Sequence, residues 1–131
     1  MAPYLARLLC DQDRYQEALD ELVFLGDDAM TLQDVDTNIY QLGARARALA
    51  ANGQPEEAER LAREAIAIGA TTDCLALHGD ALADLAHVLA ATGKPEQAAG
   101  AAREAIRLYE AKGFRPAVKR TRAFLSTVET P

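Results

Sequence analysis

The sequence predicts an all-α fold built from a stack of helix pairs, and three observations support this prediction. A short motif recurs every 40 residues, each copy carries the residues that end one helix and begin the next, and the apolar residues are mostly alanine and leucine. Only four tyrosines and three phenylalanines occur, with no tryptophan. This composition favours closely packed helices over a β-sandwich.

The repeat is visible when the chain is aligned with itself at a shift of 40 residues. The segments DRYQEA, GQPEEA and GKPEQA begin at positions 13, 53 and 93. The 16-residue windows that begin at Gly53 and Gly93 share nine identities. A constant period of this kind indicates a repeat protein in which each copy is one supersecondary unit.

Each copy is predicted to form a helix, a tight turn and a second helix. Gly53 and Gly93 suit the left-handed conformation that ends a helix, and Pro55 and Pro95 suit the first position of the next helix. Glutamates follow in the first turn, where the helix dipole favours negative charge. The predicted helices span residues 4–12, 15–25, 35–52, 55–68, 74–92, 95–112 and 116–128.

The remaining boundaries follow from single residues. Asp73 is predicted to cap the helix 74–92, and Gly69 and Gly113 are predicted to end the helices that precede them. Residues 26–34 form the only connection long enough to be a loop. We therefore expect one domain over residues 1–131, with repeats at about 1–33, 34–72 and 73–113 and a capping helix at 114–131.

The pattern resembles the tetratricopeptide repeat, a motif of small and large residues spread over two antiparallel helices. The third copy carries this motif at Leu82, Ala86, Leu89, Gly93, Pro95, Ala98, Ala102 and Ala105, and the second at Leu42, Ala46, Leu49, Gly53, Pro55, Ala58, Ala62 and Ala65. The first copy keeps only part of it and has Asp13 in place of the turn glycine. The period of 40 exceeds the usual 34, and leucines replace the aromatic anchors of the first helix.

The resemblance implies a right-handed α-α superhelix of three helix pairs plus a C-terminal capping helix. The stretch 80–113 above all is also similar to the C-terminal helical arrays of large bacterial signalling ATPases and transcriptional regulators, including those joined to nucleotide cyclases. A protein-protein interaction module within a larger signalling or regulatory protein is the function that this resemblance implies.

Stacked repeats expose a concave groove lined by the first helix of each pair. The resemblance, carried over by position, places in this groove Tyr4, Arg7, Tyr40, Ala44, Arg47, Asp80, Asp84 and His87. We expect an exposed, polar, partner-binding surface whose charge changes sign along its length. The alternative is a solvated set of helix faces without a partner.

Charge and cysteine usage exclude several classes of function. The formal net charge of −6 opposes the phosphate attraction that drives nucleic-acid binding, so no nucleic-acid partner is expected. Cys10 and Cys74 match no disulfide framework or CxxC motif, which predicts a reducing, cytoplasmic setting. No export signal or membrane-spanning run is recognised in the sequence, so no membrane partner is expected.

No catalytic or metal motif stands out, so the chain is predicted not to be an enzyme and to need no cofactor. His78 and His87 are the only histidines, and no GxSxG or phosphate-binding loop occurs. Asp80, Asp84 and His87 share one helix face, yet no second cluster completes a metal site. Cys74 is interpreted as a structural residue.

Both ends of the chain suggest contacts. The last helix carries Lys119, Arg120 and Arg122. These residues indicate either a contact with phosphate or an acidic peptide, or a polar cap that closes a repeat array. We prefer the cap, with a stripe of apolar residues on its inward side. That stripe comprises Val118, Phe124, Leu125 and Val128.

At the N-terminal end, an apolar face is expected to dock on an upstream domain or on a second copy. This face comprises Leu5, Leu8, Leu9, Leu22 and Leu25.

The sequence thus leaves three functions open, one of which is a purely structural spacer. The preferred one is a protein-interaction module that binds a partner segment through the concave groove or an end face. The other alternative is a sensor of a small ligand or peptide that is coupled to an effector domain.

Overall fold

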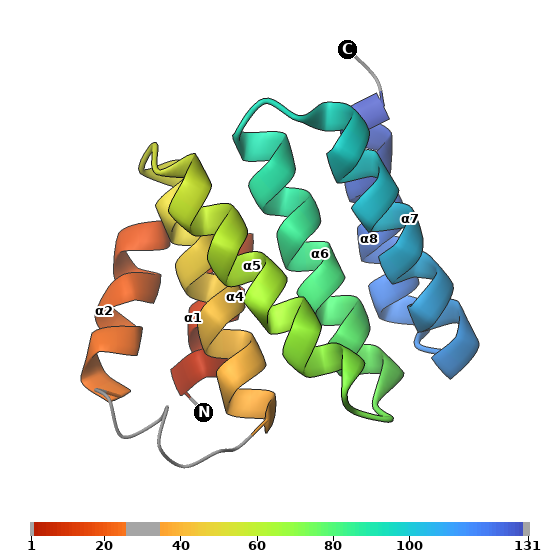
Figure 1. Ribbon diagram of the computed structural model, residues 1–131, viewed down its shortest axis with the longest axis horizontal. Coiled ribbons are helices and arrows are strands. Elements are labelled where there is room, and N and C mark those ends of the chain that lie inside the picture. Colours follow the sequence, from red (N-terminus) through yellow and green to blue (C-terminus); the bar gives the residue numbers. More distant parts are fainter. Residues whose placement is uncertain (1, 26–34, 130–131) are drawn as a thin grey trace.

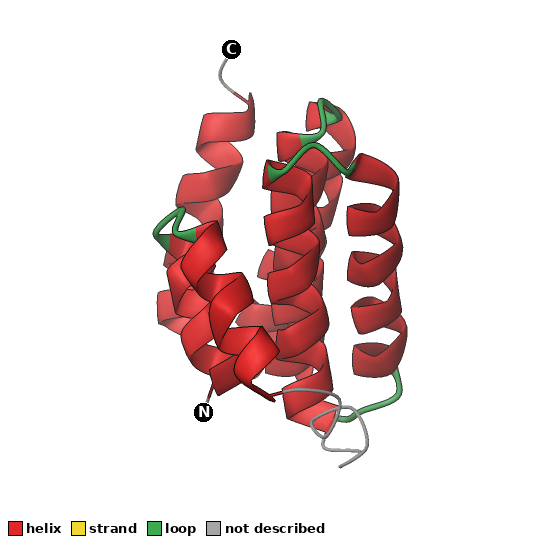
Figure 2. Ribbon diagram, turned by 90° about the vertical axis from the view of Figure 1, so that its left-hand side faces the viewer, coloured by secondary structure: helices red, strands yellow, loops and turns green. Residues whose placement is uncertain are grey.

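The structure, a computed structural model, describes residues 2–25 and 35–129, with side chains from Leu5 onward except at 22–25 and 37. This part of the chain contains seven helices and no strand (Figures 1 and 2). The helices are α1 (Ala2–Asp11), α2 (Tyr15–Leu25), α4 (Val35–Ala51), α5 (Pro55–Ala70), α6 (Leu75–Ala91), α7 (Pro95–Lys112) and α8 (Arg115–Glu129). They confirm the predicted all-α helical repeat, and the predicted loop at 26–34 lies outside the described residues.

The turns within the helix pairs follow the predicted chemistry. Gly53 and Gly93 have φ angles of 79° and 81°, the left-handed region that glycine adopts without a steric penalty. Asp13, at the equivalent position of the first copy, adopts the same region with φ 60°. Pro55 and Pro95 then occupy the first turns of α5 and α7. The first repeat therefore keeps the turn geometry although its sequence has lost the glycine.

Two predicted boundary residues are wrong, and one is confirmed. The N-cap of α6 is Cys74 rather than Asp73, and its backbone N–H donates to Thr72 Oγ1 at 3.3 Å. Gly69 does not end α5; it lies inside the helix, where a Cβ would stand 3.2 Å from His78 Cα, so close helix packing explains the glycine. Gly113 ends α7 with φ 77°, as predicted.

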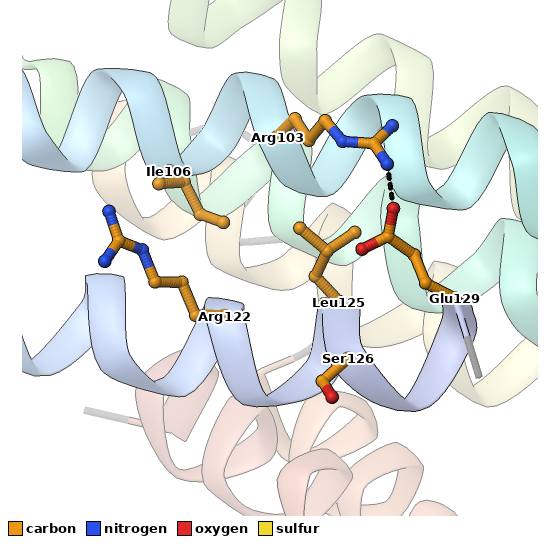
Figure 3. Close-up of a pocket in the computed structure, with 6 residues that line it drawn as sticks. All are labelled: Arg103, Ile106, Arg122, Leu125, Ser126 and Glu129. Carbon is orange, nitrogen blue, oxygen red and sulfur yellow. Dashed lines mark hydrogen bonds and ion pairs between the residues drawn. The ribbon is translucent and has the colours of Figure 1, made fainter.

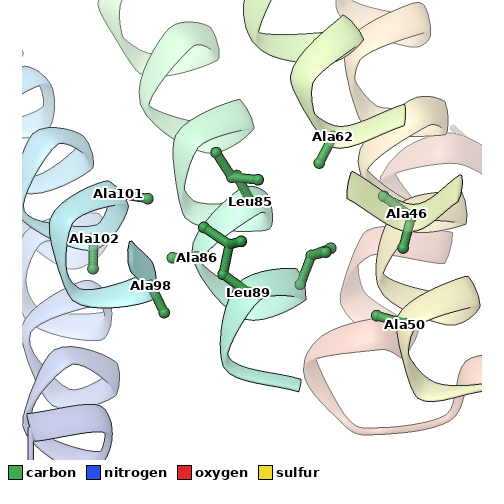
Figure 4. Close-up of a cluster of buried hydrophobic side chains, with 11 residues drawn as sticks. Ala46, Ala50, Ala62, Leu85, Ala86, Leu89, Ala98, Ala101 and Ala102 are labelled. Carbon is green, nitrogen blue, oxygen red and sulfur yellow. The ribbon is translucent and has the colours of Figure 1, made fainter. Parts of the chain in front are cut away.

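The core is made of leucines from one helix held between alanines of its neighbours. Leu85 and Leu89 of α6 lie between Ala46 and Ala62 on one side and Ala98 and its neighbours on the other (Figure 4). Because alanine side chains are small, neighbouring helices approach closely, and this core is packed without aromatic anchors. The second helix pair, α4 and α5, thus packs directly on the third, α6 and α7.

The last helix covers this core as predicted. Phe124, Leu125 and Val128 of α8 pack against the cluster formed by α4 to α7, and Val118 packs against the cluster around Tyr109. The predicted inward packing of these four side chains is therefore confirmed. Cys10 and Cys74 are free thiols. No helix in the described ranges is long and apolar enough to cross a membrane.

Candidate functional site

Several of the predicted groove residues lie at equivalent positions of successive repeats. Arg7, Arg47 and His87 are separated by one period each and lie on α1, α4 and α6. Asp80 and Asp84 lie one turn apart on α6, which places both carboxylates on one helix face. The structure therefore brings most of the predicted groove residues to one region of the molecule.

These side chains pair with one another across the repeats. Arg7 Nη1 donates to Asp84 Oδ2 at 2.6 Å, and Arg7 Nη2 lies 3.6 Å from Asp80 Oδ1. Asp84 is 1% exposed and Arg7 is 9% exposed. An ion pair thus links the first repeat to the third inside the protein.

Small residues on α4 make this long-range pair possible. A Cβ built at Gly43 would lie 2.1 Å from Asp84 Oδ2, so the carboxylate rests directly on the backbone of α4. The next residue, Ala44, adds only a methyl group and is itself buried. Arg7 can therefore reach from α1 over α4 to a carboxylate on α6.

The second arginine joins the same network. Arg47 Nη1 donates to Asp11 Oδ1 at 2.6 Å and lies 3.5 Å from Asp84 Oδ1. Arg47 is 4% exposed, whereas Asp11 is at the surface. Two guanidinium groups thus stand against the carboxylates of Asp80, Asp84 and Asp11, and buried charges are tolerated in proteins when they are paired in this way.

Two tyrosines donate hydrogen bonds to Asp80. The Tyr40 hydroxyl donates to Asp80 Oδ2 at 3.2 Å, and the Tyr109 hydroxyl donates to Asp80 Oδ1. The Arg7 guanidinium also lies over the Tyr40 ring, 5.8 Å from its centroid. A Cβ at Gly79 would meet the Tyr109 ring at 2.8 Å, so this glycine admits the ring against α6. We call the set Arg7, Asp11, Tyr40, Arg47, Asp80, Asp84 and Tyr109 the buried charge network.

Electrostatics fix the protonation states of Arg7 and of the two tyrosines. Burial alone lowers the pKa of Arg7, but the Asp84 and Asp80 carboxylates more than compensate and leave that pKa above its ordinary value. Burial and the neighbouring Asp80 raise the pKa of Tyr109 and of Tyr40. The arginine is therefore held as a cation, and both phenols are held as hydrogen-bond donors.

His87 occupies the equivalent position of the third repeat but differs in chemistry. Its ring lies against Phe124 of α8, with ring centroids 4.1 Å apart. Burial, reinforced by the Arg47 charge, lowers the pKa of His87 to about 3. The imidazole is therefore neutral at physiological pH.

A small hollow remains on the concave side, with a volume of about 200 Å³. It is lined by Arg7, Asp11, Arg47, Ala83, His87, Tyr109, Arg120, Thr121 and Phe124. Most of its polar lining belongs to the buried charge network, so these groups already have protein partners.

The expected exposure of the groove is therefore wrong for Arg7, Arg47, Asp80 and Asp84, which are all buried. Tyr40 and His87 are half-buried, and the side chain of Tyr4 lies outside the described residues. The physical reason is that each charge finds its counter-ion one or two repeats away, which position within a single repeat does not reveal. Asp11 was missed for the same reason, whereas Tyr109 meets Asp80 within the third repeat, across the pair α6–α7.

The N-terminal end of the stack presents an apolar face. Leu5 and Leu8 of α1 are 42% and 41% exposed. Two periods further along the chain, Leu85 and Val88 occupy the equivalent positions of α6 and are buried with alanines of the preceding repeat. Of the other leucines predicted for this face, Leu9 is buried instead, and the side chains of residues 22 and 25 lie outside the described part.

The C-terminal end is different. One period after Leu82, Ala86 and Leu89, which are anchor positions of the repeat, α8 carries Arg122, Ser126 and Glu129. Arg122 pairs with Glu110 at 2.5 Å, and Arg103 pairs with Glu129 (Figure 3). Arg103, Arg122, Ser126 and Glu129 line an open hollow between α7 and α8 together with Ile106 and Leu125. The outer face of α8 is thus polar at this end.

Comparison with known proteins agrees with this architecture. The tetratricopeptide repeat model matches residues 41–72 and 79–112, which together make up just over half of the chain. The chain belongs to the tetratricopeptide repeat family. The two matches correspond to the pairs α4–α5 and α6–α7. No match was found among curated proteins or among solved structures.

Membership of the tetratricopeptide repeat family has a general functional meaning. These repeats generally mediate protein-protein interactions and are typically non-catalytic. Their binding surfaces are formed by the curved stack rather than by a single motif. A partner-binding surface is therefore the kind of functional site that the family implies for this chain.

Proposed function

We propose that this tetratricopeptide repeat chain is a protein-interaction module of a larger cytoplasmic signalling or transcription-regulatory protein, and that it holds a partner helix on the end face formed by α1. The observation that carries this proposal is the exposure of Leu5 and Leu8 at interface positions of the repeat. Apolar patches of this kind mark contact surfaces.

The packing between repeats indicates which side chains a partner helix would present to this face. Leu85 and Val88 pack in one cluster with Ala58 and Ala62 of α5. The helix that fits over Leu5 and Leu8 is therefore one that presents a stripe of small residues. In the isolated chain, a second copy is expected to cover this face, since two-fold dimers are the commonest assemblies.

The concave groove is a weaker candidate for the same function. Its arginines and aspartates are engaged in the buried charge network, and a partner would have to break those pairs. A small-ligand site is likewise less favoured at this groove, because its hollow of about 200 Å³ is smaller than the roughly 300–1,000 Å³ of ordinary ligand sites.

The test is sedimentation velocity over a range of concentrations. We expect the wild-type chain to associate reversibly and the Leu5→Ser/Leu8→Ser variant to remain monomeric. Glu56→Ser/Arg60→Ser, which changes two exposed side chains on α5, is the control and should associate like the wild type. A wild-type chain that remains monomeric, or three proteins that behave alike, would contradict the proposal.

A further inference from the structure

We propose that the junction of α7 and α8 is a binding surface for an acidic segment of a partner protein. This surface, which we call the basic junction, comprises Lys112, Phe114, Arg115, Val118 and Lys119. It is distinct from the end face of α1 and does not depend on the function proposed above.

The charge of the chain is unevenly distributed along the sequence. Residues 111–128 contain five lysines and arginines and no aspartate or glutamate, within a protein whose net charge is −6. The basic residues of this stretch are thus concentrated on one helix and the turn before it. Such a local excess attracts a partner of opposite sign.

The cations of the basic junction have no counter-ion within the described part of the chain. Lys112, Arg115, Lys119 and Arg120 are exposed and form no ion pair there. The other exposed basic side chains of the described residues each pair with a carboxylate, namely Arg14, Arg60, Arg63, Lys94, Arg103, Arg107 and Arg122. Among the described residues, the exposed cations without a counter-ion are therefore those of this junction and the neighbouring Arg120.

The junction also has a receptive shape. An open hollow of about 530 Å³ lies between the end of α7 and the start of α8 and is lined by Glu110, Gly113, Arg115, Val118, Lys119 and Arg122. Its three basic side chains face a single carboxylate, Glu110, which already accepts a hydrogen bond from Arg122. A volume of this size admits one or two side chains of a bound peptide.

An apolar contact lies beside the hollow. Phe114 is 41% exposed, and its ring packs edge-on against Tyr109 with centroids 6.2 Å apart. Aromatic side chains held in one orientation are common anchors in protein interfaces. The fitting segment therefore combines carboxylates with an apolar side chain.

A protein segment fits better than a nucleic acid or a membrane. The rest of the molecule is acidic and would repel an extended polyanion or an anionic bilayer, while the junction itself offers few cations. A short acidic segment places its charge only where the cations are.

The experiment measures fluorescence anisotropy of a labelled peptide of alternating glutamate and leucine residues titrated with the full chain. We expect binding that weakens as salt is raised and no binding of the peptide with glutamine in place of glutamate. Arg115→Glu/Lys119→Glu should weaken binding by about ten-fold or more, since it replaces attraction with repulsion at two positions. Arg115→Gln/Lys119→Gln should weaken it less.

The control variant is Arg60→Glu/Arg107→Glu, which changes the net charge equally at exposed, paired arginines on α5 and α7. It should bind nearly as well as the wild type. The proposal is overturned if both charge reversals weaken binding equally, if the acidic peptide does not bind at low salt, or if single-stranded DNA or vesicles containing phosphatidylserine bind more tightly than the peptide.

Discussion

Arg7 in the first helix pair donates a 2.6 Å hydrogen bond to Asp84 in the third, and both side chains are buried. Removing one partner of a buried pair leaves an uncompensated charge, which typically costs about 3–5 kcal/mol. We therefore expect Arg7→Met to lower the free energy of unfolding by about that amount, as measured by urea denaturation.

The matched control is Arg60→Met on α5. Arg60 also forms an ion pair, with Glu57, but both side chains are largely in solvent. Exposed pairs contribute little because water screens them, so this variant should unfold at nearly the same urea concentration as the wild type. Equal losses in the two variants would mean that the Arg7–Asp84 pair carries no special weight.

We predict that the Arg7–Asp84 pair requires a glycine at position 43. Alanine at a helix interior normally stabilises a protein, but at Gly43 its Cβ would overlap Asp84 Oδ2. The overlap should cost about 1–3 kcal/mol of unfolding free energy, as overpacked cores do. In an Asp84→Ala background the same substitution should cost nothing, because the obstructing carboxylate is gone. A cost that persists in that background would contradict this explanation.

Glycines of α7 and its preceding turn provide a further comparison. Gly100 is exposed in α7 and a Cβ there meets nothing within 4 Å, so Gly100→Ala should stabilise the protein by about 0.5–1 kcal/mol. Gly93 has φ 81°, which penalises any side chain, so Gly93→Ala should destabilise it by about 1 kcal/mol. Urea denaturation of the two variants tests both signs, and the same sign for both would contradict the assignment.

The sequence was informative wherever the relevant physics was local. Turn glycines and helix-start prolines predicted the helices to within a few residues, because caps depend on near neighbours. It was misleading for Arg7, Arg47, Asp80 and Asp84, which looked like a solvated face. Their partners lie tens of residues away, and only the stacking of the repeats brings them together. Gly43 could have indicated this site, because a glycine inside a helix leaves room for another group to pack directly on the helix backbone.

The pKa of His87 predicts a specific dependence of stability on pH. The unfolded chain protonates this imidazole near pH 6.5, whereas the folded chain does so only near pH 3. Below pH 6.5 the unfolded state therefore binds the additional proton, and stability falls as pH decreases by about 1.4 kcal/mol per pH unit. Above pH 6.5 His87 contributes no pH dependence.

The measurement is urea denaturation at pH 7, 6 and 5 for the wild type and for His87→Leu. We expect the wild type to lose about 2 kcal/mol between pH 6.5 and 5 relative to the variant, which lacks the imidazole. Parallel pH profiles for the two proteins would show that His87 is not held neutral by its burial beside Phe124.

The final prediction concerns the polar outer face of α8. Arg122 and Glu129 occupy positions where earlier repeats place Leu82 and Leu89, and both are tied into ion pairs across the groove between α7 and α8. Restoring the apolar anchors with Arg122→Leu/Glu129→Leu should convert this end into an uncovered interface and cause association, because an exposed apolar groove seeks a partner. The substitutions are best made in the Leu5→Ser/Leu8→Ser background, so that the other end does not contribute. Glu56→Leu/Arg60→Leu in the same background removes the same two charge types from an exposed face of α5 and should leave the chain monomeric in sedimentation velocity. If both double variants remain monomeric, the polar residues of α8 are not what keeps this face from associating.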